Sequence, residues 1–232
     1  MSIRAVIFDV YGTLIEVGPP PVDADARWTA LWQGHIGIEP RLSLAAFATA
    51  CEQIIAREHA AARAVGIQFP EIYWPVVAAE VVPDVSRLPE PRRDEFLFRH
   101  AQLLHTVRPA VGAASVLRWL VDAGCMLGVA SNSQPYTIRE LDVALAGDGI
   151  SRNIFKPALC FWSFEHGFSK PDPRVFRLLA TRLRAQGIVP TETLMVGDRL
   201  DNDIEPARAQ GWQTWHLTPG GWPSLRDWLQ HR

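Results

Sequence analysis

Long apolar segments, an excess of one charge and paired cysteines are all missing from this sequence. The longest apolar runs, such as Ala5–Phe8 and Met126–Ala130, fall far short of the roughly 20 residues that a membrane span needs. Lysine and arginine number 23 against 25 acidic residues, so no basic surface indicates a nucleic-acid partner. The first residues lead straight into an apolar stretch, without the layout of a signal peptide. We therefore expect neither a membrane nor a nucleic-acid partner.

Neither the cysteines nor the histidines show the spacing of a metal site or of a set of disulfides. Cys51, Cys125 and Cys160 are odd in number and widely spaced in apolar surroundings, which predicts reduced thiols in a cytoplasmic protein. The seven histidines show no metal-ligand spacing, so we expect no zinc site. The nine tryptophans are scattered, which favours core packing over a stacking platform for bases.

What the sequence does contain is the pattern of an α/β protein. Of its 232 residues, 48% are hydrophobic, which is enough for a substantial core. Residues 3–8 form a short β-branched and aromatic run that predicts a buried strand. From about residue 113 onward, helix and strand patterns alternate. Strands are expected near 126–130, 158–161, 193–196 and 213–217, and helices near 113–122, 137–145, 173–185 and 204–209. This alternation predicts a doubly wound parallel sheet covered on both faces.

Between the first strand and the alternating part, the patterns are almost all helical. The proline-rich stretch 16–22 predicts a linker. Helices are expected around 25–32, over 44–65 behind a Ser43 cap, from Pro70, and from Pro91 to about 105. We therefore predict a core domain made of residues 1–16 and 108–232, with an all-helical domain at 17–107 inserted into it.

Four segments of the predicted core carry residues suited to chemistry, each at the end of a strand or just before a helix. They are Asp9-Val-Tyr-Gly-Thr13, Ser131-Asn132, Lys170 before the helix at 173, and Gly197-Asp198 with Asp203. The carboxyl ends of parallel strands meet at one edge of a sheet, where loops and helix N-termini also gather. We therefore expect these segments to converge.

In this order and spacing, the four segments resemble the motifs of the haloacid dehalogenase (HAD) superfamily, in its helical-cap branch. The resemblance runs from residue 5 to about 217 and implies a hydrolase with a Rossmann-like core and a helical cap. It implies that Asp9 is the nucleophile and forms a covalent aspartyl intermediate. Ser131 would hydrogen-bond the transferred group, and Lys170 would neutralise charge around it. Secondary residues of the implied site are Tyr11, Thr13 and Asn132.

The resemblance also implies a bound Mg²⁺. Its ligands would be Asp9, Asp198, Asp203 and the backbone carbonyl of Tyr11, an all-oxygen set of the kind that Mg²⁺ prefers. The three carboxylates carry −3 and Lys170 returns +1, so a divalent cation brings the site to neutrality. Without it, each contact between an anionic substrate and a carboxylate at 4 Å would cost about 1 to 4 kcal/mol.

Tyr11 departs from the phosphatase pattern. In phosphatases of the superfamily, the residue two after the nucleophile is usually a second Asp, which acts as general acid and base. A phenol with a pKa of about 10 serves poorly as a base near neutrality. The Asp-x-Tyr-Gly-Thr form is typical of 2-haloacid dehalogenases, in which the departing halide needs no proton. Those enzymes, however, usually lack the metal motif that Asp198 and Asp203 represent here.

Three functions therefore stay open. The metal motif favours a Mg²⁺-dependent phosphatase acting on a small phosphorylated metabolite, because two extra carboxylates would harm a metal-free site for a carboxylate substrate. With Tyr11 in place of the acid/base, slow turnover or a preference for activated esters and acyl phosphates is expected. One alternative is a metal-free 2-haloacid dehalogenase that uses Asp9 as nucleophile. The other is a catalytically weak or non-enzymatic binding protein that kept the fold.

Each candidate residue also has a simpler interpretation when taken alone. Asp9 could cap a turn, Ser131 and Asn132 could be turn residues, and Asp203 could cap the next helix. In the predicted cap, one helix carries basic residues that could form a substrate-selecting patch, although a solvated polar surface is the favoured interpretation. These basic residues are Arg57, His59 and Arg63.

Overall fold

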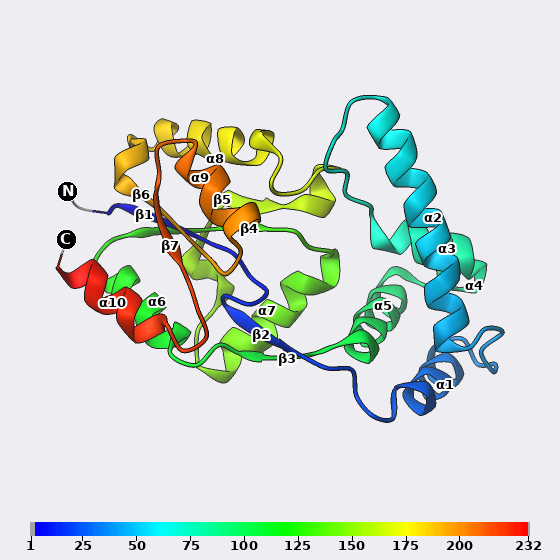
Figure 1. Ribbon diagram of the computed structural model, residues 1–232. Helices are drawn as coiled ribbons and strands as arrows, with labels where there is room; N and C mark the ends of the chain where they lie inside the picture. The colour runs from blue at the N-terminus through cyan, green and yellow to red at the C-terminus, as the bar shows by residue number, and fades with distance from the viewer. Residues whose placement is uncertain (1–2, 232) are drawn as a thin grey trace.

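The computed structural model describes residues 3–231, so the predicted ends of the core domain at 1, 2 and 232 lie outside the described residues. At its centre is a five-stranded parallel sheet with the order β5-β4-β1-β6-β7 (Figure 1). The strands are β1 (Ala5–Phe8), β4 (Met126–Ser131), β5 (Phe155–Trp162), β6 (Thr193–Gly197) and β7 (Gln213–His216). The predicted α/β fold class is confirmed, and all five predicted strands are present.

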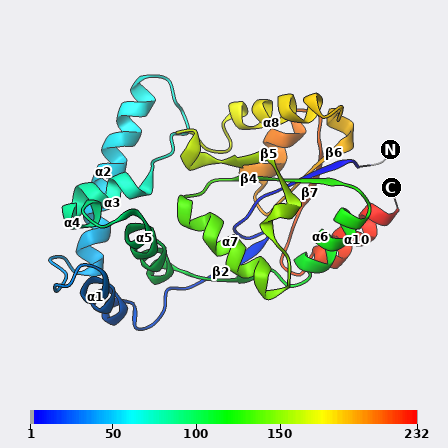
Figure 2. The same cartoon turned by 180° about the vertical axis from the view of Figure 1, so that it is seen from behind.

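Helices cover both faces of this sheet (Figures 1 and 2). In β1, Val6 and Phe8 pack into the hydrophobic cluster that includes α6, α7 and α10, whereas Ala5 and Ile7 pack into the cluster that includes α8 and α9. All four side chains are fully buried, so the central strand is fixed from both sides. The helices are α6 (Ala113–Asp122), α7 (Pro135–Gly147), α8 (Pro173–Ala185), α9 (Glu205–Arg208) and α10 (Trp222–Gln230).

The cap is a separate group of helices with its own hydrophobic cluster, which includes Trp28, Trp32 and Phe96. An antiparallel ribbon of β2 (Ile15–Gly18) and β3 (Thr106–Pro109) joins it to the core (Figure 1). The predicted limits of the cap, 17 and 107, fall inside this ribbon, and the division into two domains there stays a prediction. The cap helices are α1 (Ala24–His35), α2 (Leu44–Ala64), α3 (Trp74–Val81), α4 (Pro83–Ser86) and α5 (Glu90–Leu104).

One predicted cap helix begins in a different place, and the difference bears on the site. The prediction of a helix from Pro70 is wrong, because α3 begins at Trp74. Pro70 instead forms a bridge with Phe168 of the core, and the Glu71 N–H donates to the Gly167 carbonyl at 3.1 Å. Tertiary pairing with the core thus overrides the local signal that proline gives at a helix start.

Several short elements gave no signal in the sequence. The ribbon β2–β3, α4 and α10 were not predicted, and the expected linker at 16–22 contributes to β2. The expected helix at 204–209 is preceded by a π-helical turn, Leu200–Ile204. The 3₁₀ turns are Arg152–Ile154, Ser163–Glu165 and Pro190–Glu192. Among the helices of the described range, none is long and apolar enough to cross a membrane.

Replacement of Phe96 by Ala should destabilise the cap strongly. Phe96 is fully buried, and its ring lies 6.0 Å from that of Trp28 and 6.4 Å from that of Trp32. A cavity of this kind lowers the free energy of unfolding by about 3–5 kcal/mol, which urea denaturation would measure. The control, Val76→Ala at a 61% exposed position, should change it by less than about 0.5 kcal/mol. Equal losses in the two variants would contradict the packing described here.

Candidate active site

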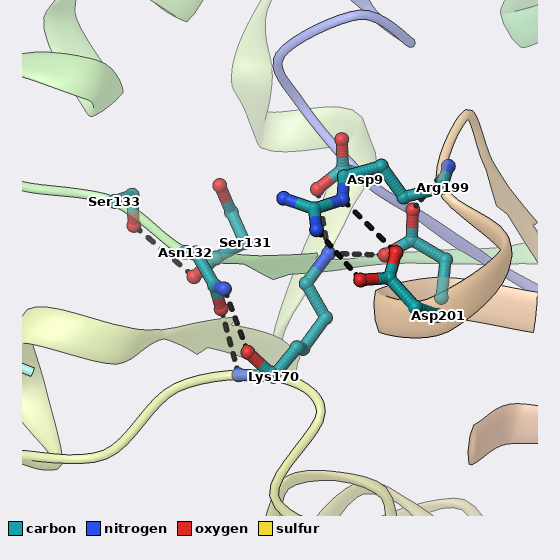
Figure 3. A network of polar contacts seen from close by, with 8 residues as sticks. Asp9, Ser131, Asn132, Ser133, Lys170, Arg199 and Asp201 are labelled. Carbon is teal, nitrogen blue, oxygen red and sulfur yellow. Dashed lines mark hydrogen bonds and ion pairs between the residues drawn. The ribbon is translucent and has the colours of Figure 1, made fainter. Parts of the chain in front are cut away.

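The carboxyl ends of three neighbouring strands bring the predicted site segments together. Because β1 is paired in parallel with both β4 and β6, Asp9, Ser131 and Asp198 lie at the same edge of the sheet. Lys170 reaches this edge from the loop before α8. Figure 3 shows the side chains of Asp9, Ser131 and Lys170 gathered there.

Lys170 links two of the predicted carboxylates. Its Nζ donates to Asp9 Oδ1 at 2.6 Å and to Asp203 Oδ1 at 2.5 Å. The side chains of Lys170 and Asp203 are 2% and 1% exposed. Burial alone lowers the pKa of Lys170, but the two carboxylates outweigh it and raise that pKa above its ordinary value. The ammonium group therefore stays charged, as a buried charge can when it is paired on two sides.

Asp9, Asp198 and Asp203 form an acidic cluster in which carboxylate oxygens lie within 4.8 Å of one another. Burial raises the pKa of Asp9 to about 6; Lys170 opposes this effect, and Asp203 and Asp198 add to it. Burial and Asp203 likewise raise the pKa of Asp198. Three carboxylates and one ammonium leave a charge of −2, which one divalent cation would cancel. The charge and the oxygen donors of this cluster therefore fit Mg²⁺.

Two glycines allow the cluster to be this compact. A Cβ added at Gly12 would lie 2.3 Å from Asp198 Oδ2, and one at Gly197 would lie 2.3 Å from Asp203 Oδ2. Gly12 also has a φ of +77°, a conformation that favours glycine. Both glycines stand in the sequence motifs, but their contacts with the carboxylates could not be seen from the sequence.

Asn132, a predicted secondary residue, holds the backbone of Lys170. Its Nδ2 donates to the Lys170 carbonyl at 2.8 Å, and the Lys170 N–H donates to its Oδ1 at 2.7 Å (Figure 3). An amide that makes both hydrogen bonds to one residue fixes the direction from which the lysine side chain leaves the loop. Figure 3 also shows the exposed Asp201 paired with Arg199.

The hydroxyl groups of Ser131 and Thr13 lack a protein partner. Both residues are fully buried, and neither Oγ forms a hydrogen bond within the described chain. A buried polar group left unpaired costs about 1–3 kcal/mol, so it needs an explanation such as a ligand. This observation fits the predicted role of Ser131 in contacting the transferred group, a role that stays a prediction.

Tyr11 places its side chain against α7. Its hydroxyl donates to Glu140 Oε2 at 2.5 Å and lies 2.9 Å from Thr137 Oγ1. Burial and the Glu140 carboxylate raise the pKa of Tyr11 well above its ordinary value. Sequence reasoning missed Glu140, because its partner lies 129 residues away and nothing in the helix pattern points to it. The role of the Tyr11 carbonyl as a metal ligand stays a prediction.

The cap reaches the loops around the site through residues 70–74, which include the wrongly predicted helix start at Pro70. Gln134 Oε1 accepts from the Trp74 N–H at 2.8 Å, and its Nε2 donates to Glu71 Oε1 at 3.0 Å. The Ser163 hydroxyl donates to the other oxygen of Glu71 at 2.6 Å. Gln134 follows Ser131-Asn132 closely in the chain, so this contact joins the cap to the loop after β4. The sequence gave no sign of it.

The three basic cap residues are placed on α2. Arg57 donates to both oxygens of Glu80 at 2.8 Å, so its guanidinium is already engaged within the cap. His59 borders a cavity of about 320 Å³ that Glu71 also lines. Arg63 is exposed. A substrate-selecting role stays a prediction for all three, and for Arg57 it would require that the ion pair with Glu80 be broken.

A larger cavity of about 620 Å³ opens beside the acidic cluster. Its lining includes Asp198 and Thr13, together with Arg108 of β3 and His216 of β7. Its volume lies within the range of small-molecule sites. A small ligand could therefore reach Asp198 from this side.

Comparison with known proteins agrees with this geometry. The family model of haloacid dehalogenase-like hydrolases matches residues 3–211, nearly the whole chain. The chain therefore belongs to the haloacid dehalogenase-like hydrolase family, and it is a hydrolase with an α/β core.

Its curated relatives include phosphatases. The chain is 29% identical over 220 residues to the N-acetylmuramic acid 6-phosphate phosphatase of Pseudomonas aeruginosa, with 92% of this chain and 81% of that protein covered. It is 38% identical over 88 residues to the phosphoserine phosphatase of Thermus thermophilus, with 38% of this chain and 32% of that protein covered. The chain thus matches about a third of the length of the second relative.

A solved structure of similar fold is that of a HAD family enzyme from Bacteroides thetaiotaomicron. It superposes with a TM-score of 0.60 at 16% identity, covering 97% of this chain and 98% of that one. A variant of that enzyme, solved in complex with magnesium and inorganic phosphate, superposes with a TM-score of 0.57 at 15% identity, covering 97% and 99%. At such identities the likeness shows the fold alone.

Replacement of Asp9 by Asn should stabilise the metal-free protein at high pH. The native pKa of about 6 lies above the ordinary 3.8, so ionisation of Asp9 lowers the free energy of unfolding as the pH rises from about 4 to about 6, and the loss persists above pH 6. We expect a gain in the free energy of unfolding of up to about 3 kcal/mol at pH 8 that vanishes near pH 4. Urea denaturation in the presence of a chelator would measure it.

The matched control is Asp201→Asn, because Asp201 is an exposed carboxylate on the loop that also carries Asp198 and Asp203. It should show no gain that grows with pH. An Asp9→Asn gain of equal size at pH 4 and pH 8 would contradict the raised pKa.

Proposed function

We propose that this protein is a Mg²⁺-dependent phosphatase that hydrolyses a small phosphorylated metabolite through an aspartyl-phosphate intermediate on Asp9. The observation that carries this proposal is the buried arrangement in which Lys170 links Asp9 to Asp203 beside Asp198. It combines a carboxylate nucleophile, a fixed cation and oxygen donors for a metal ion. The phosphatase names of the relatives support it.

In the proposed reaction, Asp9, Lys170 and Ser131 have separate roles. In the first step, a carboxylate oxygen of Asp9 attacks phosphorus, and the bond between phosphorus and the leaving oxygen breaks. Lys170 holds Asp9 in place and offsets the negative charge of the phosphoryl oxygens, and the unpaired hydroxyl of Ser131 donates to one of them. In the second step, water attacks phosphorus and the bond to Asp9 breaks, which releases phosphate.

The proposed ligands of Mg²⁺ are Asp9, Asp198 and Asp203, together with the backbone carbonyl of Tyr11. Bound there, the ion would supply charge stabilisation for the phosphoryl group.

Tyr11 is the one observation that favours a second candidate, a metal-free 2-haloacid dehalogenase with Asp9 as nucleophile. The charge of the site weighs against it. Without a metal ion, the cluster and Lys170 together carry −2, which would repel a carboxylate substrate. Lys170 is also engaged by two carboxylates already and cannot offset a third to the same degree. We therefore place the phosphatase first.

A panel of phosphorylated metabolites, assayed with Mg²⁺ and with EDTA beside a parallel assay of halide release from 2-haloacids, tests the proposal. We expect at least one compound to release phosphate in the presence of Mg²⁺ and not in the presence of EDTA, because the metal-free site repels the phosphoryl dianion. Asp9→Asn should abolish it, since the nucleophile is lost. The control Asp201→Asn should keep it, because that side chain is exposed and paired with Arg199.

The other outcomes are equally distinct. Halide release that is indifferent to EDTA would establish the dehalogenase. Binding of Mg²⁺ or phosphate without any turnover above the Asp9→Asn background would indicate a binding protein that kept the fold. Phosphate release that persists in Asp9→Asn would overturn the mechanism.

A further inference from the structure

The hydroxyl of Tyr11 has a defined hydrogen-bond direction. Gln134 N–H donates to Thr137 Oγ1 at 3.1 Å, so the Thr137 hydroxyl is free to donate its own hydrogen to Tyr11 Oη at 2.9 Å. Tyr11 then donates its single hydrogen to Glu140 Oε2 at 2.5 Å. Both capacities of the phenol are therefore used by one turn of α7, not by the reacting atoms near Asp9.

The partner that receives this hydrogen is itself held in place. The Glu140 side chain is completely buried, and its second oxygen lies 3.1 Å from His105 Nε2, at the end of α5. The His105 ring packs edge-on against the Tyr11 ring, with 5.8 Å between centroids. Tyr11 is thus enclosed by α7 on one side and by the junction of cap and ribbon on the other.

The described residues of the acidic cluster offer no other ready proton donor. Lys170 donates two of its three hydrogens to Asp9 and Asp203 and serves there as a fixed cation. Asp198 and Asp203 are the proposed metal ligands and act there as carboxylates. The Ser131 hydroxyl is unpaired, but an alcohol gives up no proton near neutrality. Among these residues, a leaving group therefore has no positioned general acid.

We propose that Glu140, by holding the Tyr11 hydroxyl away from the reacting atoms, makes this site selective for phosphorylated substrates whose leaving group needs no proton, above all acyl phosphates. The inference rests on the proposed phosphatase function and names its substrate class. Glu140 is a specificity-determining residue that acts through Tyr11. Ordinary alkyl phosphates are disfavoured because their alkoxide is a far stronger base than a carboxylate.

The atoms balance without a general acid. A bond forms between an Asp9 oxygen and phosphorus, and the bond from phosphorus to the acyl oxygen breaks. The carboxylate leaves with the electron pair and takes no proton. Water then attacks phosphorus, the bond to Asp9 breaks, and both hydrogens of the water end on phosphate or in the solvent.

The test compares kcat/KM for acetyl phosphate and ethyl phosphate, two substrates of similar size, with Mg²⁺ present. The leaving-group ratio is kcat/KM for acetyl phosphate divided by kcat/KM for ethyl phosphate. General acid catalysis contributes about 10²–10⁴-fold, so its absence predicts a ratio of at least that order, measured after subtraction of spontaneous hydrolysis. Tyr11→Phe should leave the ratio unchanged, whatever it does to the overall rate, because the phenol donates nothing to the leaving group.

Three substitutions on α7 test Glu140 itself. Glu140→Leu removes the acceptor and frees the Tyr11 hydroxyl, so the ratio should shrink at least several-fold. Glu140→Gln keeps an acceptor oxygen and should keep the ratio. The matched control, Asp142→Ala, removes an acid of the same helix that pairs with Arg152, and it should also keep the ratio. A change in fold stability alone would lower both kcat/KM values together and would not move the ratio.

The results separate this inference from the proposed function. A ratio near one in the wild type, with activity that depends on Asp9, overturns the inference and leaves the phosphatase standing. So does a ratio that grows in Tyr11→Phe, because Tyr11 would then be the acid. An unchanged ratio in a folded Glu140→Leu overturns the role of Glu140; if that variant does not fold, the Tyr11→Phe comparison decides. Absence of phosphate release from every compound overturns both proposals.

Discussion

The structure of the site depends on one buried ammonium group, that of Lys170, which donates hydrogen bonds to two carboxylates. Lys170 donates to Asp9 and to Asp203, which lie in segments 194 residues apart, and all three side chains are nearly removed from solvent. Removal of Lys170 would leave the buried carboxylates without their cation, and breaking a buried ion pair in this way costs about 3–5 kcal/mol. The fold must therefore bring the loops after β1 and β6 and the loop before α8 to one point. With Asp198 beside it, this contact leaves the site with a charge of −2, which one divalent cation would cancel.

The rest of the core fixes the positions of Lys170 and its two carboxylate partners. The central strand β1 is buried on both faces, so Asp9 leaves it from a rigid base. Gly12 and Gly197 let the carboxylates approach backbone that a Cβ would block, and Asn132 fixes the lysine loop from the neighbouring strand. None of these contacts is strong alone. Together they leave Lys170 few arrangements other than the one that reaches both carboxylates, which is the preorganisation that electrostatic catalysis depends on.

The parts of this arrangement that depend on local pattern were visible in the sequence. A strand of apolar residues that ends in Asp9 predicts a carboxylate at the sheet edge, and the alternation after it predicts which other strands lie beside it. The contacts of Gln134 with Trp74 and of Glu140 with Tyr11 were not visible, because they join residues that are 60 and 129 positions apart and leave no periodic trace. The helix start predicted at Pro70 was wrong for the same reason, since the backbone of Pro70 and Glu71 pairs with Phe168 and Gly167 of the core.

The two motifs that disagree in the sequence serve different physical needs in the structure. Asp198 and Asp203 belong to the charge balance around Lys170, whereas the Tyr11 side chain belongs to the packing of α7 and the cap junction. An Asp at that position is too short to span the distance to Glu140, and its charge would repel that buried carboxylate. The buried Glu140 and the tyrosine therefore require one another. The tyrosine that resembles a dehalogenase motif and the carboxylates that resemble a phosphatase metal motif can thus stand in one site, because each has its own partners there.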